Sequence, residues 1–181
     1  MQVPYVDFIF REGGEFVTRT SKELFTGKRI VIFALPGAFT PTCTEQQLPG
    51  FEAAYDEIRG FGVDEVYCLS VNDAFVMNAW LKDLGITKVK ALPDGNANFT
   101  AAAGMAVRKD NLGFATRSWR YAAVISDGTL EWAGVEEGKR DLASDDPYDA
   151  STPERVIQYL QARQEQEKQL QNQTELSGVA N

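Results

Sequence analysis

The sequence predicts an α/β fold in which a central mixed β-sheet is flanked by helices. Two observations carry this prediction. Short apolar runs at 29–35 and 65–71 are each followed by a segment with helical periodicity, which is typical of strands buried on both faces of a sheet. Residues 120–135 then form two apolar stretches joined by Asp127-Gly128, a dipeptide that favours a tight hairpin. Strand–helix units followed by a hairpin indicate a sheet with both parallel and antiparallel pairs.

The first elements are a hairpin, a strand and a helix. Residues 8–20 alternate apolar and polar around Gly13-Gly14, which predicts a hairpin. The buried strand at 29–35 comes next. The helix that follows has one apolar face, formed by Leu48, Phe51, Tyr55 and Ile58.

The later helices have recognisable ends. Asn72 is the expected N-cap of a helix that stops at Gly85 and carries Phe75, Val76, Trp80 and Leu84. Residues 88–95 predict a short strand and a turn. Thr152 as N-cap and Pro153 at the first helical position predict a final helix, with Val156, Ile157 and Leu160 facing inward.

The composition is that of one globular domain. The 181 residues are 44% hydrophobic and 24% charged, and this length suffices for a sizeable core. The net charge of −8 at pH 7 argues against binding to nucleic acid or to an anionic membrane surface. We expect one domain over 1–160. The glutamine-rich remainder, 161–181, should extend the last helix into a partly disordered tail, with a partner-bound coil as the alternative.

We expect no targeting signal, and several classes of site are excluded. The N-terminal segment lacks a charged start, Asp7 interrupts its apolar part, and no later run approaches membrane-spanning length. Two cysteines do not form a disulfide framework, so we expect a cytoplasmic protein. Because the chain has no histidine, Ser-His-Asp and Cys-His systems and histidine-ligated zinc are excluded. We therefore expect no metal and no cofactor, and chemistry from cysteine, carboxylates, arginine and backbone dipoles.

Cys43 lies where the strand at 29–35 gives way to a helix. Thr40 as N-cap and Pro41 as the first helical residue would place it in the first turn. There the unpaired amides and the helix dipole favour a negative charge, and a thiolate is the reactive form of cysteine. Local features leave two interpretations open: a reactive cysteine with a lowered pKa, or a small buried residue at a helix start.

The stretch PGAFTPTC at 36–43 resembles the active-site motif of peroxiredoxins: a proline, three residues, a threonine, two residues and a cysteine. The longer form is similar to the peroxiredoxin-5 subfamily. The resemblance continues to about Leu160 through LPGFEAAYDEI, CLSVNDAFVMNAW, LPDGNANFT and LGFATRSWRYAAVISDG. It implies a thioredoxin-like fold and the reduction of hydrogen peroxide or organic hydroperoxides, which is an antioxidant activity.

The resemblance also implies roles within the motif. Cys43 would be the nucleophile that attacks a peroxide oxygen and becomes a sulfenic acid. Thr40 would direct its hydroxyl at the sulfur and the peroxide, or serve only as a helix cap. Pro36 would shield the reacting atoms from water, or simply end the strand. The remaining motif positions implied in substrate binding are Gly37, Phe39 and Thr42.

A distant arginine completes the set that the resemblance implies. The match places it at Arg120, which would hold the thiolate and polarise the O–O bond, and Arg117 and Arg108 are nearby rivals. Backbone N–H groups at the helix start should bind the developing charge. Many relatives have histidine four residues after the nucleophile, where this chain has Gln47. A glutamine can hydrogen-bond but cannot titrate.

The second departure concerns how the cysteine is regenerated. Some relatives use another cysteine near the C-terminus, but residues 134–151 contain none. Cys68 is interpreted as a core residue. The resemblance therefore implies a one-cysteine cycle in which an outside thiol clears the sulfenic acid. Similarity to relatives fused to glutaredoxin favours glutathione with glutaredoxin, and thioredoxin is the alternative.

Two other functions are compared with this one. A peroxide sensor would form the same sulfenic acid without turnover. A thiol–disulfide oxidoreductase usually needs C-x-x-C, whereas this chain has C-T-E-Q at 43–46. Because the family often dimerises around the active site, we also expect a homodimer. Four apolar residues would contribute to that interface or else belong to the core: Phe39, Phe75, Val76 and Trp80.

Overall fold

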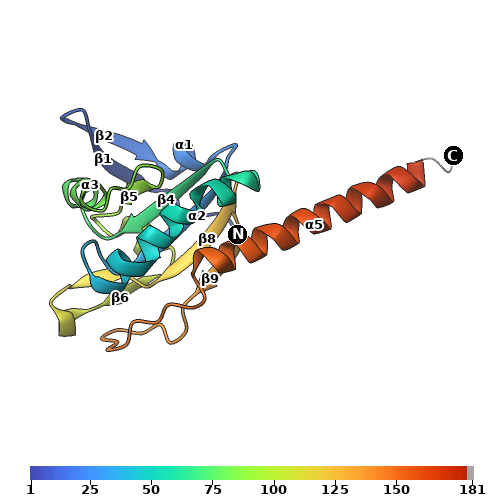
Figure 1. The fold of residues 1–181 in the computed structure, drawn as a ribbon. Helices are drawn as coiled ribbons and strands as arrows, with labels where there is room; N and C mark the ends of the chain where they lie inside the picture. The colour runs from blue at the N-terminus through green and yellow to red at the C-terminus, as the bar shows by residue number, and fades with distance from the viewer. Residues whose placement is uncertain (179–181) are drawn as a thin grey trace.

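The computed structural model of the protein describes residues 1–178 and is built on a five-stranded sheet with the order β5-β4-β3-β8-β9 (Figure 1). The first three strands of this order are mutually parallel, and β8 pairs antiparallel with both β3 and β9. The predicted mixed sheet is thus confirmed. Its strands are β3 (Arg29–Leu35), β4 (Glu65–Ser70), β5 (Lys90–Pro93), β8 (Tyr121–Ser126) and β9 (Thr129–Val135).

Helices and short strands cover the two faces of the sheet. One apolar core, on the face that includes Cys43 and Phe33, receives side chains from α2 (Leu48–Gly60), α3 (Ala74–Asp83) and α5 (Pro153–Gly178). The other core includes Ile32 and Tyr121. It receives side chains from β1 (Asp7–Glu12), α1 (Ser21–Phe25) and α4 (Asn98–Ala102). The remaining elements are β2 (Glu15–Thr20), a π-helical turn η1 (Cys43–Gln47), β6 (Ala106–Arg108), a 3-10 turn η2 (Asp110–Leu112) and β7 (Thr116–Ser118).

The elements predicted from strong local patterns are confirmed. Strand β3 begins and ends at the predicted residues, and six of its seven residues are buried, as expected for an apolar run inside a sheet. The β8–β9 turn places Asp127 at φ 47° and Gly128 at φ 73°, the left-handed pair that a two-residue hairpin requires. The first hairpin also forms, with β1 antiparallel to β2.

The N-cap expected at Asn72 is wrong by one residue. Asp73 caps α3, and its carboxylate accepts a hydrogen bond from the Val76 amide at 2.9 Å. The Asn72 side-chain oxygen instead accepts from the Ala38 amide at 3.0 Å and from the Ser70 hydroxyl at 2.6 Å. Both residue types favour N-caps, and Asn72 is engaged by the loop that precedes Cys43.

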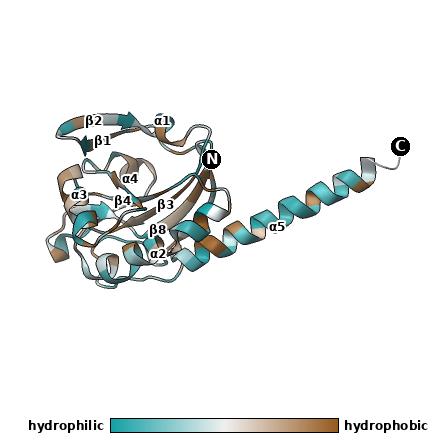
Figure 2. Ribbon diagram, turned by 45° about the horizontal axis from the view of Figure 1, so that its top comes forward, coloured by the Kyte–Doolittle hydropathy of each residue, from teal (hydrophilic) through white to brown (hydrophobic). Residues whose placement is uncertain are grey.

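Helix α5 has a buried first part and a projecting second part. Thr152 caps it, because its hydroxyl accepts from the Arg155 amide at 3.3 Å, and Val156 and Leu160 are buried as predicted. Figure 1 shows the rest of the helix extending away from the sheet, and Figure 2 shows this part as mostly hydrophilic. The expected tail includes 179–181, which lie outside the described residues. The domain division after Leu160 stays a prediction.

Within residues 1–178, no helix combines the length and the apolar character that crossing a membrane requires.

Candidate active site

Cys43 lies in the first turn of the helical segment that follows β3. The segment begins at Pro41, and its π-helical turn η1 leads directly into α2. The Thr40 carbonyl accepts from the Thr44 amide at 3.0 Å, so Thr40 stands at the expected N-cap position. The thiol is only 1% exposed and is not part of a disulfide. The sulfur is therefore held by the start of a helix and enclosed by the protein.

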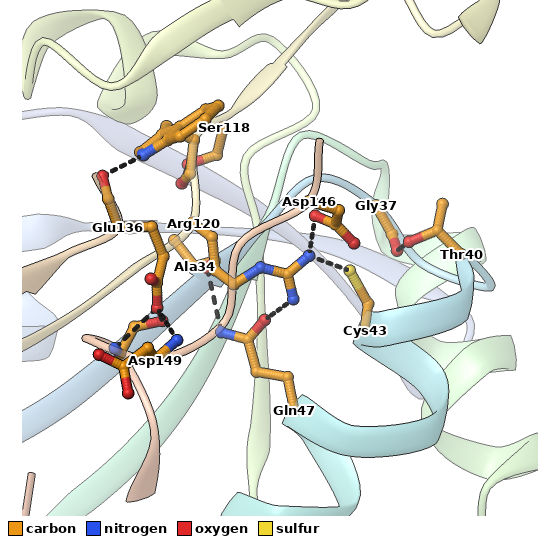
Figure 3. Close-up of polar contacts among 12 residues, drawn as sticks. Ala34, Gly37, Thr40, Cys43, Gln47, Ser118, Arg120, Glu136, Asp146 and Asp149 are labelled. Carbon is orange, nitrogen blue, oxygen red and sulfur yellow. Dashed lines mark hydrogen bonds and ion pairs between the residues drawn. The ribbon is translucent and has the colours of Figure 1, made fainter. Parts of the chain in front are cut away.

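Arg120 brings its guanidinium to this sulfur from the residue just before β8 (Figure 3). Its Nη2 lies 3.9 Å from the Cys43 Sγ, and its exposed fraction is 2%. Nη1 donates to the Gln47 Oε1 at 2.8 Å. Among the three arginines compared from the sequence, the structure places Arg120 against the thiol. Arg108 forms an exposed ion pair with Asp110 instead.

Gln47 orients this arginine. Its Nε2 donates to the Ala34 carbonyl at 3.2 Å, which leaves Oε1 directed at Arg120 (Figure 3). A fully buried side-chain amide with both ends paired has one preferred orientation. The sequence marked Gln47 only as a departure from histidine. The structure shows that this departure keeps a hydrogen-bond acceptor where the guanidinium needs one.

The loop before the helix is tied down at several points. The Thr40 hydroxyl donates to the Gly37 carbonyl at 2.7 Å, and Nη1 of Arg117 donates to the Pro36 carbonyl at 3.0 Å. A Cβ at Gly37 would lie 2.3 Å from the Arg117 Nη1, so a larger residue there would displace the Arg117 guanidinium from the Pro36 carbonyl. Arg117 is therefore next to the site, but it holds the Pro36–Gly37 backbone.

The other two residues expected to bind substrate are less enclosed. Phe39 adopts a left-handed φ of 65°, a conformation that is uncommon for a bulky residue, and its side chain is 53% exposed. Its ring lies 6.4 Å from that of Trp80. Thr42 is half-buried beside Cys43.

The expected lowering of the Cys43 pKa is wrong in direction. Burial raises the pKa of the Cys43 thiol above its ordinary value. The charge of Arg120, followed by the Thr40 side chain and the Gly37 backbone, lowers this pKa, while Asp146 adds to the rise. The dipole of the helix start is a local effect that favours the thiolate. Removing the thiolate from water is the larger effect here.

Cys68 has the properties of the core residue that the sequence predicted. It lies in β4 opposite Phe33 and is completely buried. Burial raises the pKa of its thiol well above the ordinary value, which makes the sulfur unreactive. Across residues 1–178, no three His, Cys, Asp or Glu side chains gather as potential metal ligands.

Sequence reasoning missed the segment that closes the site. Asp146 accepts from the Arg120 Nη2 at 2.5 Å, and the Tyr148 ring lies 5.5 Å from the Arg120 Cζ. From the sequence, residues 134–151 are notable only for their lack of cysteine. The acidic pair at 145–146 was the one available signal, and a charged pair in a loop is usually solvated.

Fold and site together define a thiol-dependent redox enzyme. The Redoxin family matches residues 6–151. The chain is 52% identical over 168 residues to a curated peroxiredoxin of Sinorhizobium fredii, y4vD. The aligned region covers 88% of this chain and 89% of that protein. The chain belongs to the peroxiredoxin family and is a thiol peroxidase with a thioredoxin-like fold.

Two further relatives agree with this assignment. The hybrid peroxiredoxin hyPrx5 of Haemophilus influenzae is 40% identical over 159 residues, which are 88% of this chain and 64% of that protein. The solved structure of a Plasmodium falciparum antioxidant protein, described as a 1-Cys peroxiredoxin, superposes with a TM-score of 0.86 at 35% identity. The match covers 90% of this chain and 97% of that one. The resemblance on which the sequence analysis relied is confirmed.

Proposed function

We propose that the protein reduces hydrogen peroxide and organic hydroperoxides through a sulfenic acid on Cys43. The observation that carries the proposal is the 3.9 Å approach of the Arg120 Nη2 to the Cys43 Sγ inside an enclosed site. A guanidinium at this distance stabilises a thiolate and can hydrogen-bond the oxygen that the thiolate attacks. Stabilising the thiolate and hydrogen-bonding the peroxide oxygen both require Arg120 to stay in this position.

The reaction forms one bond to sulfur and breaks one O–O bond. The Cys43 sulfur loses its proton and attacks one peroxide oxygen, and the other oxygen leaves with a proton as water or alcohol. The sulfur is oxidised to a sulfenic acid. We assign Pro36, Gly37 and Thr40 to the approach of the peroxide, because their loop is fixed by the Arg117 contact to the Pro36 carbonyl and by the Thr40 contact to the Gly37 carbonyl. Phe39 and Thr42 complete the substrate-binding segment.

The sulfenic acid is then cleared by an outside thiol. A thiolate attacks the Cys43 sulfur, water leaves, and the resulting mixed disulfide is reduced by exchange with a second thiol. The complete burial of Cys68 supports this one-cysteine cycle, because that thiol would have to leave the sheet to react. Similarity to relatives fused to glutaredoxin favours glutathione and glutaredoxin over thioredoxin.

The working form is a cytoplasmic homodimer. Two of the four aromatic and aliphatic residues considered for its interface support this: the exposed fractions of Phe39 and Phe75 are 53% and 55%. Exposed aromatic rings are typical of an interface. Trp80, in contrast, is completely buried and belongs to the core, and Val76 is half-buried.

Peroxide consumption with each reductant tests the proposed cycle. We expect many turnovers per chain when glutathione and glutaredoxin are supplied, and little above background with thioredoxin and its reductase. The measurement is NADPH oxidation at a protein concentration far below that of peroxide. Turnover with thioredoxin alone would contradict the proposed reductant. A single oxidation per chain with both systems would instead indicate a peroxide sensor.

A further inference from the structure

The segment between β9 and α5 is anchored directly beside Arg120. Glu136 is buried, and its Oε1 accepts from the Asp149 amide at 2.8 Å, the Ser151 amide at 2.9 Å and the Ser151 hydroxyl at 2.8 Å (Figure 3). The Glu136 amide donates to the Arg120 carbonyl at 3.2 Å. Glu136 therefore ties the returning end of the segment, through its carboxylate, to the backbone of Arg120, through its amide.

This anchored segment places Asp146 on the guanidinium nitrogen that faces the sulfur. The Arg120 Nη2 donates to the Asp146 Oδ1 at 2.5 Å and lies 3.9 Å from the Cys43 Sγ. The Arg120 Nε is buried and has no hydrogen-bond partner among the described residues. Among the described residues, the oxygen acceptors of the guanidinium are therefore Gln47 on Nη1 and Asp146 on Nη2, while Nη2 also faces the Cys43 sulfur and the Tyr148 ring lies 5.5 Å from Cζ.

The two members of this ion pair differ in their exposure. The Arg120 side chain is 2% exposed, whereas the Asp146 side chain is 46% exposed. Asp146 thus reaches the buried guanidinium from the solvent side. A carboxylate and a thiolate both favour the same positive charge, so each weakens the attraction of the other for it.

Few other charges act on Cys43. Arg117 in β7, Tyr148 in the same segment as Asp146, and Cys68 in β4 also interact electrostatically with Cys43. Burial raises the pKa of both Tyr148 and Cys68, so both are neutral near neutral pH. The charges that set the ionisation of Cys43 are therefore those of Arg120, Arg117 and Asp146.

We propose that Asp146 is a positioning residue that holds Arg120 against Cys43 and, through its negative charge, limits how strongly Arg120 stabilises the thiolate. This proposal rests on the proposed function. Two effects of opposite sign follow. Fixing the guanidinium favours reaction of the thiolate with peroxide, and sharing its charge reduces the fraction of Cys43 that is ionised. A half-exposed carboxylate on a surface segment can supply both effects.

The substitution Asp146→Asn separates these effects, because asparagine keeps a hydrogen-bond acceptor and removes the charge. We expect the ionisation midpoint of Cys43 to fall by roughly one pH unit. The midpoint is measured from the ultraviolet absorbance of the thiolate, with the Cys43→Ser protein subtracted. Asp145→Asn is the matched control, since Asp145 precedes Asp146 and pairs with the exposed Arg140. It should leave the midpoint unchanged.

A second variant tests the positioning effect. Asp146→Ala removes charge and acceptor together. With Cys43 fully ionised in both variants, we expect Asp146→Ala to react with peroxide about tenfold more slowly than Asp146→Asn. An unchanged midpoint in Asp146→Asn, or an equal shift in Asp145→Asn, would overturn the proposal, as would equal rates for the alanine and asparagine variants. The titration needs no peroxide. If the wild-type protein did not react with peroxide, the proposed function would be contradicted, and the titration of Asp146→Asn would by itself decide the role of Asp146.

Discussion

Replacing Cys43 by serine will lower peroxide turnover at least about 1,000-fold, because a hydroxyl in this position is not ionised and cannot replace the sulfur nucleophile. The fold should survive, since serine is close to cysteine in size and the nearby Arg120 and Thr40 offer polar contacts. The measurement is steady-state peroxide consumption with glutathione and glutaredoxin. Circular dichroism verifies that the variant is folded.

Cys68→Ala is the matched control for this prediction. It removes the other thiol and keeps an apolar side chain in β4. The free energy of unfolding should fall by about 1 kcal/mol, which is close to the cost of losing one buried methylene. Turnover should stay near the wild-type value. A loss of turnover in Cys68→Ala comparable to that in Cys43→Ser would mean that both sulfurs take part, which would contradict the one-cysteine cycle.

Replacing Arg120 by methionine will lower the rate of reaction with peroxide about 100- to 1,000-fold, the usual effect of removing one donor that stabilises developing charge. The ionisation midpoint of Cys43 should also rise, because Arg120 is the main influence that lowers its pKa. The experiment follows the loss of Cys43 thiol after mixing with peroxide, over a range of pH.

The same substitution should reduce stability modestly. Methionine fills similar volume, and the half-exposed Asp146 can be hydrated, but the buried Gln47 Oε1 loses its donor, which costs about 1–3 kcal/mol. Arg108→Met is the control, because Arg108 is paired only at the surface. If Arg108→Met slowed the reaction as much as Arg120→Met, the assignment of Arg120 would be wrong.

The parts of the fold that the sequence predicted well are those fixed by local pattern. Strand β3 is a continuous apolar run, and the β8–β9 turn depends on the Asp127-Gly128 dipeptide itself. The short helix α4 was missed because its stability is tertiary. The buried Asp94 accepts from the amides of Phe99 and Thr100 and from the Thr100 hydroxyl, and nothing in residues 98–102 alone indicates this.

Helix α1 shows a signal that was present and was not used. Thr20 and Glu23 form a capping box, in which each side chain accepts a hydrogen bond from the backbone of the other. The spacing of a threonine and a glutamate three residues later is readable from the sequence. The five-residue length of α1 left too little periodicity for the pattern to be noticed.

The site residues also divide into those that a local motif predicts and those that depend on the tertiary structure. Pro36, Thr40 and Cys43 lie within eight residues, so one local motif identified them. Arg120 is far away in the sequence, and the family resemblance pointed to it. Asp146 could not be inferred, because its position depends on how Glu136 anchors the last segment. The direction of the Cys43 pKa was also wrong for a tertiary reason, the burial of the thiol.

The account depends on a peroxide oxygen being transferred to the sulfur of Cys43. The direct measurement is mass spectrometry of the protein after one equivalent of hydrogen peroxide and a sulfenic-acid trapping reagent. The predicted result is one adduct per chain, on the peptide that contains Cys43, in both the wild-type and Cys68→Ala proteins. An adduct on Cys68, or a disulfide between the two cysteines in place of an adduct, would contradict it.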